Sequence, residues 1–214
     1  MINDNEILSF IKNITKNKLI KDIVKYDKLK IIDKITDEKI IKNVINSTNE
    51  NQKICKKWLI EKTKKYIENY NNPKICVAAG WYGHLSNMLL PYTDKTIISF
   101  DLDDECKTIG EKLYKNKNIK FITSDIKNYN CNDFDIVICT SCEHIEQNVI
   151  NNFLYNRKKE SLVILQSNNY YEITEHINCK KTLKDFVKDY DKNTICYYNE
   201  LKLEKYNRYM IVFK

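Results

Sequence analysis

The sequence predicts an α/β protein: a Rossmann-like, mostly parallel seven-stranded sheet with an antiparallel terminal hairpin, preceded by an N-terminal helical segment. Two observations carry this prediction. After residue 73, short and nearly continuous apolar runs alternate with helical patterns, which is typical of a parallel sheet covered on both faces. The last two apolar runs are joined by a link too short for a crossover helix, so they are expected to pair as a hairpin.

Seven apolar runs predict the strands, and the amphipathic stretches between them predict the helices. The expected strands are 74–79, 96–101, 119–123, 134–140, 161–166, 194–201 and 208–213. The expected helices between them are 84–90, 104–115, 146–155 and 181–190.

Residues 1–72 have a helical pattern. Apolar residues recur at helical spacing over 7–14 and 40–45, and a longer helix over 54–70 is expected to stop at Pro73. We therefore predict two domains, a helical cap over residues 1–72 and a sheet domain over residues 73–214. The cap is expected to cover the carboxyl edge of the sheet.

Composition excludes several classes of protein. The 214 residues are 43% hydrophobic, which rules out wholesale disorder and a fibrous protein. No apolar run approaches the roughly 20 residues that cross a bilayer, and the first residues are acidic where a signal peptide is basic. We expect a cytoplasmic protein with no membrane partner.

The eight cysteines are scattered, and without a secretion signal they are expected to be reduced. Cys139 and Cys142 form a C-x-x-C, but zinc would need a second pair at matching spacing, which the sequence lacks. The sequence therefore predicts no metal site.

Charge is unevenly distributed. Residues 1–72 hold 16 Lys or Arg and 10 Asp or Glu, whereas residues 73–214 hold 20 and 19. Only Arg157 and Arg208 are arginines, a lysine bias that fits an AT-rich coding sequence of a phage, a large virus or a low-GC bacterium. A solvated lysine surface is favoured for the first segment, and a nucleic-acid partner bound through its basic helices stays open.

Glycine and aspartate mark one candidate site. The chain has three glycines, and Gly80 and Gly83 come directly after the first predicted strand, where a strand–turn–helix junction uses glycine for positive φ and for close approach to a ligand. Asp101 ends the second strand and Asp125 follows the third. Carboxylates in this order suit the hydroxyls and the base of a nucleoside held at the carboxyl edge of the sheet.

These motifs resemble those of the class I S-adenosylmethionine-dependent methyltransferases. V-A-A-G-W-Y-G (77–83) resembles the first motif, S-F-D-L-D (99–103) the acidic second motif and S-D-I (124–126) the adenine-contacting third. D-I-V-I-C-T-S-C-E-H-I (135–145) resembles the fourth strand and its continuation. The usual first motif is D/E-x-G-x-G-x-G, from which Ala79 and Trp81 depart.

The resemblance implies S-adenosylmethionine as cofactor and assigns site residues to it. The expected cofactor-binding residues are Ala79, Gly80, Trp81, Gly83, Asp101, Leu102, Asp125, Ile126 and Thr140. On the acceptor side, the loops after the fourth and fifth strands supply the expected catalytic residues His144, Tyr170 and His176 and the expected substrate-binding residues Glu143, Asn168, Asn169 and Tyr171. His144 is the favoured general base or acceptor-orienting group.

The leading interpretation is therefore a methyltransferase acting on an unidentified methyl acceptor. A small molecule or sugar is favoured over nucleic acid, because the sheet domain is almost neutral. One alternative is a protein that binds, sequesters or degrades S-adenosylmethionine without methyl transfer. Another is a glycosyltransferase, because Asp101-Leu102-Asp103 is a D-x-D after an apolar strand.

Overall fold

The computed structural model describes residues 38–115 and 117–214. The chain divides into two compact units between Thr48 and Asn49. The described part of the first unit contains the helix α4 (Glu38–Asn46), which confirms the helix expected over 40–45. The helix expected over 7–14 lies outside the described residues.

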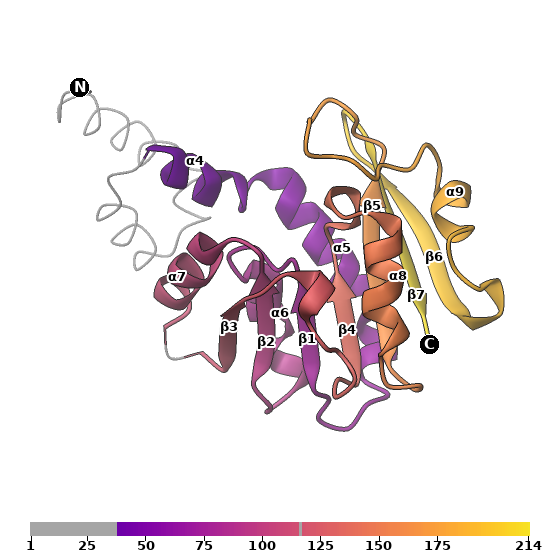
Figure 1. Ribbon diagram of the computed structural model, residues 1–214, viewed down its shortest axis with the longest axis horizontal. Coiled ribbons are helices and arrows are strands. Elements are labelled where there is room, and N and C mark those ends of the chain that lie inside the picture. The colour runs from indigo at the N-terminus through magenta and orange to yellow at the C-terminus, as the bar shows by residue number, and fades with distance from the viewer. Residues whose placement is uncertain (1–37, 116) are drawn as a thin grey trace. The chain divides into compact units, whose positions relative to one another are not determined.

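The second unit is built on a seven-stranded sheet of order β3-β2-β1-β4-β5-β7-β6 (Figure 1). Its first five strands pair in parallel and match the expected runs to within two residues. They are β1 (Ile75–Ala78), β2 (Ile97–Asp101), β3 (Ile119–Thr123), β4 (Ile136–Cys139) and β5 (Leu162–Asn168). The chain order reverses between β1 and β4, and ligands of open α/β sheets bind outside the carboxyl ends of the strands at such a point.

The reversed last strand of the prediction is confirmed. The strand β7 (Asn207–Phe213) pairs antiparallel with both β5 and β6 (Ile195–Lys202), so it alone among the seven runs against the others. The register places Asn168 of β5 opposite Arg208 of β7. This pairing extends β5 two residues beyond its expected end.

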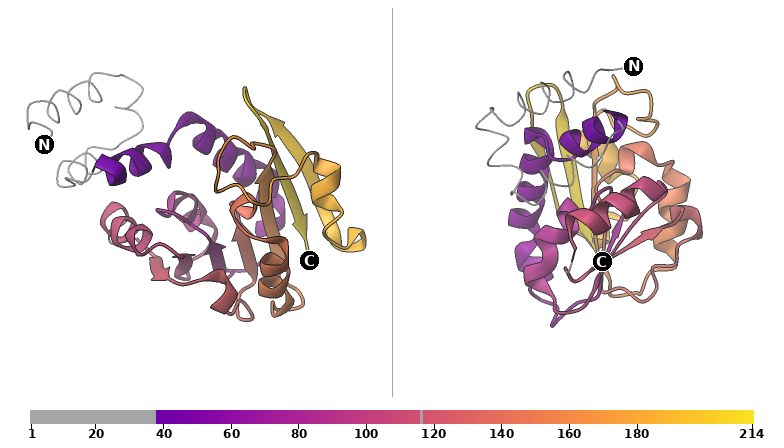
Figure 2. Two further views of the ribbon diagram at one scale, coloured as in Figure 1. Left: turned by 45° about the horizontal axis from the view of Figure 1, so that its top comes forward. Right: turned by 90° about the vertical axis from the view of Figure 1, so that its left-hand side faces the viewer.

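Helices cover both faces of the sheet, as the continuous apolar strands predict (Figure 2). On one face, α5 (Glu50–Ile67) and α6 (His84–Leu89) pack on alternate strand residues such as Val77 and Ile138. On the other face, α8 (Gln147–Tyr155) and α9 (Leu183–Val187) pack on the intervening ones, such as Cys76 and Cys139. The helix α7 (Asp104–Leu113) connects β2 to β3.

The helix α5 belongs with the sheet. Asn49 caps its first turn by accepting a hydrogen bond from the Gln52 N–H at 2.9 Å, and its buried Trp58 and Leu59 lie in the core of the sheet. The structure therefore divides the chain about 24 residues earlier than the expected boundary at residue 72. A cap over the carboxyl edge stays a prediction, now restricted to residues before 49.

The helix α9 is shorter than the expected 181–190. The Lys180 N–H donates to the Asn168 carbonyl at 3.0 Å, which ties the preceding residues to β5. The Thr182 hydroxyl then accepts from the Asp185 N–H at 3.2 Å and starts the helix. The start of α9 is thus set by contacts with a distant strand.

The structure bears on two expectations drawn from composition, which concern the cysteines and membrane-spanning segments. Each of the eight cysteines is a free thiol, and six of them are buried. Within the described residues, none of the helices combines the length and the apolar character needed to cross a membrane.

Candidate functional site

A cavity of about 290 Å³ lies at the carboxyl ends of β1 to β4. Its walls come from the end of β2, from the loops after these four strands, from Val149 of α8 and from one residue of the loop after β5. The lining residues are Ala79, Phe100, Asp101, Leu102, Ser124, Asp125, Ile126, Lys127, His144, Ile145, Glu146, Val149 and Ile177. The cavity therefore occupies the point where the strand order reverses.

Five of the nine expected cofactor residues line this cavity. They are Ala79, Asp101, Leu102, Asp125 and Ile126. Gly80, Trp81, Gly83 and Thr140 are absent from its lining. The glycines instead shape the loop, and the Thr140 carbonyl accepts a hydrogen bond from Arg208.

The loop after β1 alternates between left-handed and ordinary backbone. Ala79, Trp81 and Gly83 have φ of 48°, 51° and 80°. These are the alternate positions that hold glycine in D/E-x-G-x-G-x-G, so the loop has a left-handed residue at each of them with a glycine at only the third. Left-handed backbone costs an L-residue roughly 1–2 kcal/mol, so Ala79 and Trp81 hold conformational strain.

The two glycines of this loop are explained by packing. A Cβ on Gly80 would lie 2.4 Å from the Ser99 hydroxyl, and a Cβ on Gly83 would lie 2.4 Å from the Phe121 ring. The expectation of positive φ holds for Gly83 and not for Gly80. Both positions require glycine because neighbouring strands approach the loop closely.

The strain at Ala79 gives a stability prediction with a matched control. Ala79→Gly is expected to raise the free energy of unfolding by up to about 1 kcal/mol, because relief of the left-handed strain exceeds the added entropy of the unfolded chain. Ala78→Gly, in the buried strand β1, is expected to lower it by about 1 kcal/mol. Urea unfolding of both variants measures the difference, and equal destabilisation by the two would contradict the strain.

Asp101 joins the loops after β1 and β2. Its Oδ2 accepts from the Trp81 N–H at 2.9 Å and its Oδ1 accepts from the Asp103 N–H at 3.3 Å. Burial raises the pKa of Asp101, and these backbone N–H groups oppose that rise. A carboxylate has about four acceptor positions, so both oxygens keep capacity for a ligand in the cavity.

Asp125 lies on the β3 side of the cavity. Its Oδ1 accepts from the Lys127 N–H at 2.9 Å, which starts a short turn after β3. The side chain of Ile126 lines the cavity beside it. Asp125 and Ile126, two of the expected cofactor-binding residues, thus line the cavity side by side in sequence.

A buried ion pair lies beneath the loops after β4 and β5. Arg208 Nη1 lies 2.6 Å from Glu143 Oε1, and the two residues are 6% and 4% exposed. Asn168 Nδ2 donates to the same oxygen at 2.7 Å, and Arg208 also donates to Gln166 and to the Thr140 carbonyl. Glu143 and Asn168, two of the expected substrate-binding residues, are thus buried partners of Arg208.

The expected catalytic histidines lie together. The His144 and His176 rings are 4.5 Å apart between centroids and meet edge to face, although 31 residues separate them in sequence. His176 Nδ1 lies 2.6 Å from the Tyr170 carbonyl. Desolvation by the surrounding loops lowers the pKa of His144. The charge of Glu143 opposes this, while proximity to His176 and Arg208 lowers the pKa further.

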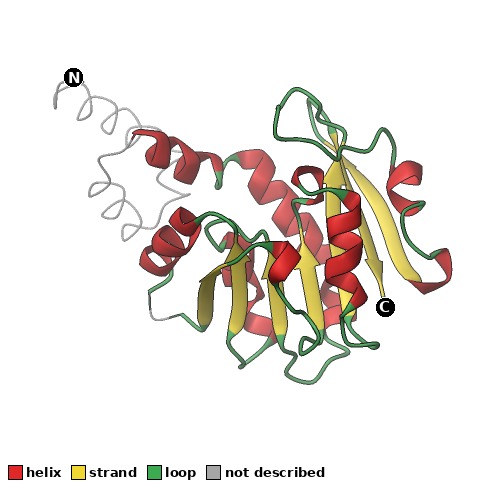
Figure 3. Cartoon of the chain, viewed as in Figure 1, coloured by secondary structure: helices red, strands yellow, loops and turns green. Residues whose placement is uncertain are grey.

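The loop after β5 carries the remaining expected residues (Figure 3). The Tyr170 ring stacks on Tyr206 of the β6–β7 turn at 5.1 Å, and Asn169 exchanges hydrogen bonds with the Asn207 backbone at 2.7 and 3.3 Å. Tyr171 is 56% exposed. Tyr170 therefore contributes its backbone carbonyl to His176, while Asn169 and Tyr171 lie outside the lining of the cavity.

No protein family model and no curated protein matches this sequence. Solved structures do match. Magnesium protoporphyrin IX methyltransferase from Synechocystis PCC 6803, with bound SAH, is similar at a TM-score of 0.62 and 14% identity, over 87% of this chain and 98% of that one. The N-methyltransferase NodS from Bradyrhizobium japonicum WM9 is similar at 0.60 and 11%, over 78% and 97%. A SAM-dependent methyltransferase from Aquifex aeolicus is similar at 0.54 and 13%, over 72% and 87%.

The chain has the fold of the class I methyltransferases. This confirms the Rossmann-like sheet expected from the sequence. At identities of 11–14%, the similarity concerns the fold alone. The roles of individual residues are inferred from the geometry of the site.

Two residues near the site of this methyltransferase fold, Arg208 and Lys56, were not recognised as candidates from the sequence. Arg208 is one of only two arginines in a chain with 36 basic residues, and this rarity is the signal that could have identified it. Lys56 of α5 had no such signal. Burial, and then the charge of Arg208, lower the pKa of Lys56 to about 8.

Proposed function

We propose that this protein is an S-adenosylmethionine-dependent methyltransferase. The observation that carries the proposal is the cavity at the reversal of the strand order. Its lining includes Asp101 and Asp125 from β2 and the loop after β3, and His144 from the loop after β4 across β1. A nucleoside-bearing ligand fits the acidic and apolar side, and an acceptor fits the side with the histidine.

The lining of the cavity suits the adenosyl part of the cofactor. Asp101 would accept the ribose hydroxyls, and Asp125 would accept from the adenine amino group. The apolar side chains of Leu102, Ile126 and Val149 line the same cavity and would pack on the adenine ring. When bound, S-adenosylmethionine supplies an activated methyl group on its sulfonium.

The acceptor would be bound by the loops after β4 and β5. His144 and the 62% exposed Ile177 come from these loops and line the cavity. We favour a small molecule or a sugar, because residues 73–214 are almost neutral and a groove that follows phosphates is basic. Transfer of tritiated methyl groups into fractionated lysate would identify the acceptor pool. Label found in nucleic acid alone would favour nucleic acid over a small molecule or a sugar as the acceptor.

The second candidate is a protein that binds the cofactor without transferring its methyl group. The observation in its favour is the first loop, in which Ala79 and Trp81 occupy left-handed positions that glycine would relax. Binding of S-adenosylmethionine with no label in any lysate pool would support this candidate over methyl transfer.

Loss of the Asp101 charge tests the cofactor site. Asp101→Asn is expected to weaken binding of S-adenosylhomocysteine by about 1.5–3 kcal/mol, because charge-assisted hydrogen bonds to the ribose are lost while an amide oxygen still accepts from Trp81. Isothermal titration calorimetry measures the affinity. The matched control is Asp94→Asn, an exposed aspartate before β2 at the opposite edge, which is expected to bind as the wild type does.

The same calorimeter tests the proposal as a whole. S-adenosylmethionine, S-adenosylhomocysteine, NAD and a UDP-sugar are titrated in parallel into the full chain. We expect the first two to bind and the others not to bind. Absence of binding by the first two at millimolar ligand would overturn the proposal, and binding of a UDP-sugar would favour a glycosyltransferase.

A further inference from the structure

Glu143, His144 and His176 bring three potential metal ligands to one place. A carboxylate oxygen of Glu143 and one ring nitrogen from each histidine all lie within 4.8 Å of one another. We propose that these three residues bind a divalent transition-metal ion at the border of the cavity. Ligands about 2.1 Å from a common ion lie roughly 3–4 Å apart, so a small inward shift of the exposed His144 completes the site.

The hydrogen bonding of the Glu143 carboxylate supports its role as a metal ligand. Its Oε1 accepts from Arg208 and Asn168. Its Oε2 is buried and has no hydrogen-bond partner among the described residues. A buried carboxylate oxygen without a partner is costly, and a bound cation would remove that cost.

The His176 ring is held by a backbone carbonyl, as the rings of metal-binding histidines usually are. A carbonyl oxygen only accepts hydrogen bonds, so the 2.6 Å contact with Tyr170 requires His176 Nδ1 to carry a proton. The lone pair of the neutral ring is then on Nε2. Such backbone contacts fix the tautomer and the orientation of histidines that bind metals.

The donor set selects the class of ion. Two imidazoles and one carboxylate suit Zn²⁺, Co²⁺, Ni²⁺, Fe²⁺ or Mn²⁺. Mg²⁺ and Ca²⁺ prefer oxygen ligands, and here the only carboxylate of the cluster already neutralises Arg208. We therefore expect a transition metal and not an alkaline-earth ion.

Three protein ligands leave coordination positions for water or a substrate. His144 lines the cavity, so an oxygen or nitrogen of the acceptor can occupy one of these positions. This role in holding the acceptor rests on the proposed methyl transfer. Metal binding itself depends only on the three side chains.

Metal binding by the untagged full chain tests the proposal. The protein is stripped with a chelator and titrated with Co²⁺, whose visible absorption reports nitrogen ligands, and with Zn²⁺ in competition. We expect one equivalent to bind to the wild type. In His144→Ala and in His176→Ala we expect at least a 100-fold loss of affinity. The matched control is His84→Gln. His84 lies in α6 and is the one histidine of the sequence outside the cluster, so this variant is expected to bind Co²⁺ as the wild type does.

Thermal unfolding with and without metal gives a second measurement. Zn²⁺ is expected to raise the unfolding midpoint of the wild type and of His84→Gln, and to leave both cluster variants unchanged, because an ion that binds only the folded state stabilises it. Folded variants that fail to respond support the site. Absence of Co²⁺ and Zn²⁺ binding by the wild type, or unchanged affinity in either cluster variant, would overturn it.

Calorimetry with S-adenosylhomocysteine separates this proposal from the proposed function. The wild type and the His176→Ala variant are expected to bind it equally, since His176 lies outside the lining of the cavity. Cofactor binding without metal binding would overturn the metal site and leave the methyltransferase proposal standing. Metal binding without cofactor binding would overturn the methyltransferase proposal and leave the metal site standing.

Discussion

His144→Ala is expected to lower kcat by about 10²–10⁴-fold while the affinity for S-adenosylhomocysteine stays nearly unchanged. His144 follows β4 and lines the cavity, and β1 lies between β4 and the strand β2 that carries Asp101. In the proposed function this ring contacts the acceptor and not the adenosyl part of the cofactor. The ring can act as a general base or as a ligand of an ion that holds the acceptor. In both roles, its loss is expected to slow the transfer step.

The measurement is a steady-state assay with tritiated cofactor and the acceptor found in the lysate fractions. His84→Gln serves as the control for loss of a histidine elsewhere in the fold. A wild-type kcat that a chelator leaves unchanged would indicate the general base, and a chelator-sensitive kcat would indicate the ion. A loss of less than tenfold would show that alignment alone drives transfer and that His144 is structural.

Arg208→Met is expected to lower the free energy of unfolding by about 3–5 kcal/mol, because it leaves the Glu143 carboxylate charged and buried without its partner. For a chain of this size the midpoint of thermal unfolding falls by roughly 6–20 °C. The double variant with Glu143→Leu is expected to recover most of this loss, since apolar side chains can replace a buried ion pair.

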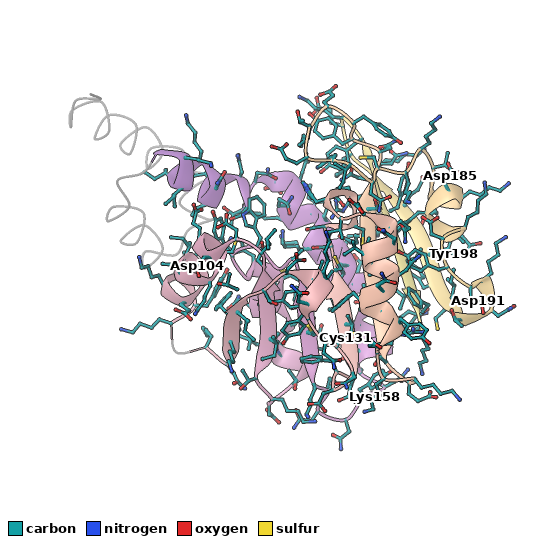
Figure 4. The ribbon with its side chains drawn as sticks, viewed as in Figure 1. Asp104, Cys131, Lys158, Asp185, Asp191 and Tyr198 are labelled. Carbon is teal, nitrogen blue, oxygen red and sulfur yellow. The ribbon has the colours of Figure 1, made fainter. Side chains whose placement is uncertain are left out.

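Lys158→Met is the matched control. Lys158, which lies between α8 and β5 (Figure 4), forms an ion pair with Asp135 at the same 2.6 Å separation, but the lysine side chain is 52% exposed. Water screens such exposed pairs, so we expect little change in the unfolding midpoint. Equal losses from the two substitutions, or a double variant no more stable than Arg208→Met, would show that burial of the Glu143 charge is not the cause.

Much of the fold could be predicted because local patterns determine it. The apolar runs of β1 to β5 alternate with helices, and the short link before β7 permits only a hairpin. The division between Thr48 and Asn49 lies earlier than the expected boundary at residue 72, and the reason is physical. An amphipathic helix such as α5 shows in sequence that it has a partner surface, but not that this surface is the sheet.

The candidate site was predicted in part. Asp101 ends β2, and Asp125 and His144 lie in the loops after β3 and β4; a parallel sheet brings such positions to one edge. The burial of Glu143 could not be inferred, because it depends on Arg208, which only the register of β5 with β7 brings near. The packing reason for Gly80 likewise depends on Ser99 of a neighbouring strand.

The position of β7 has a consequence for how the protein forms during translation. This strand is the last of the seven to leave the ribosome, yet it lies between β5 and β6. It also supplies Arg208, the partner of Glu143. The nascent chain can therefore assemble the part of the cavity that contains Asp101 and Asp125 early, while β6 must wait without a neighbour. The part that follows β4 acquires the charge of Arg208 only when β7 pairs between β5 and β6, so the two parts of the site form at different times.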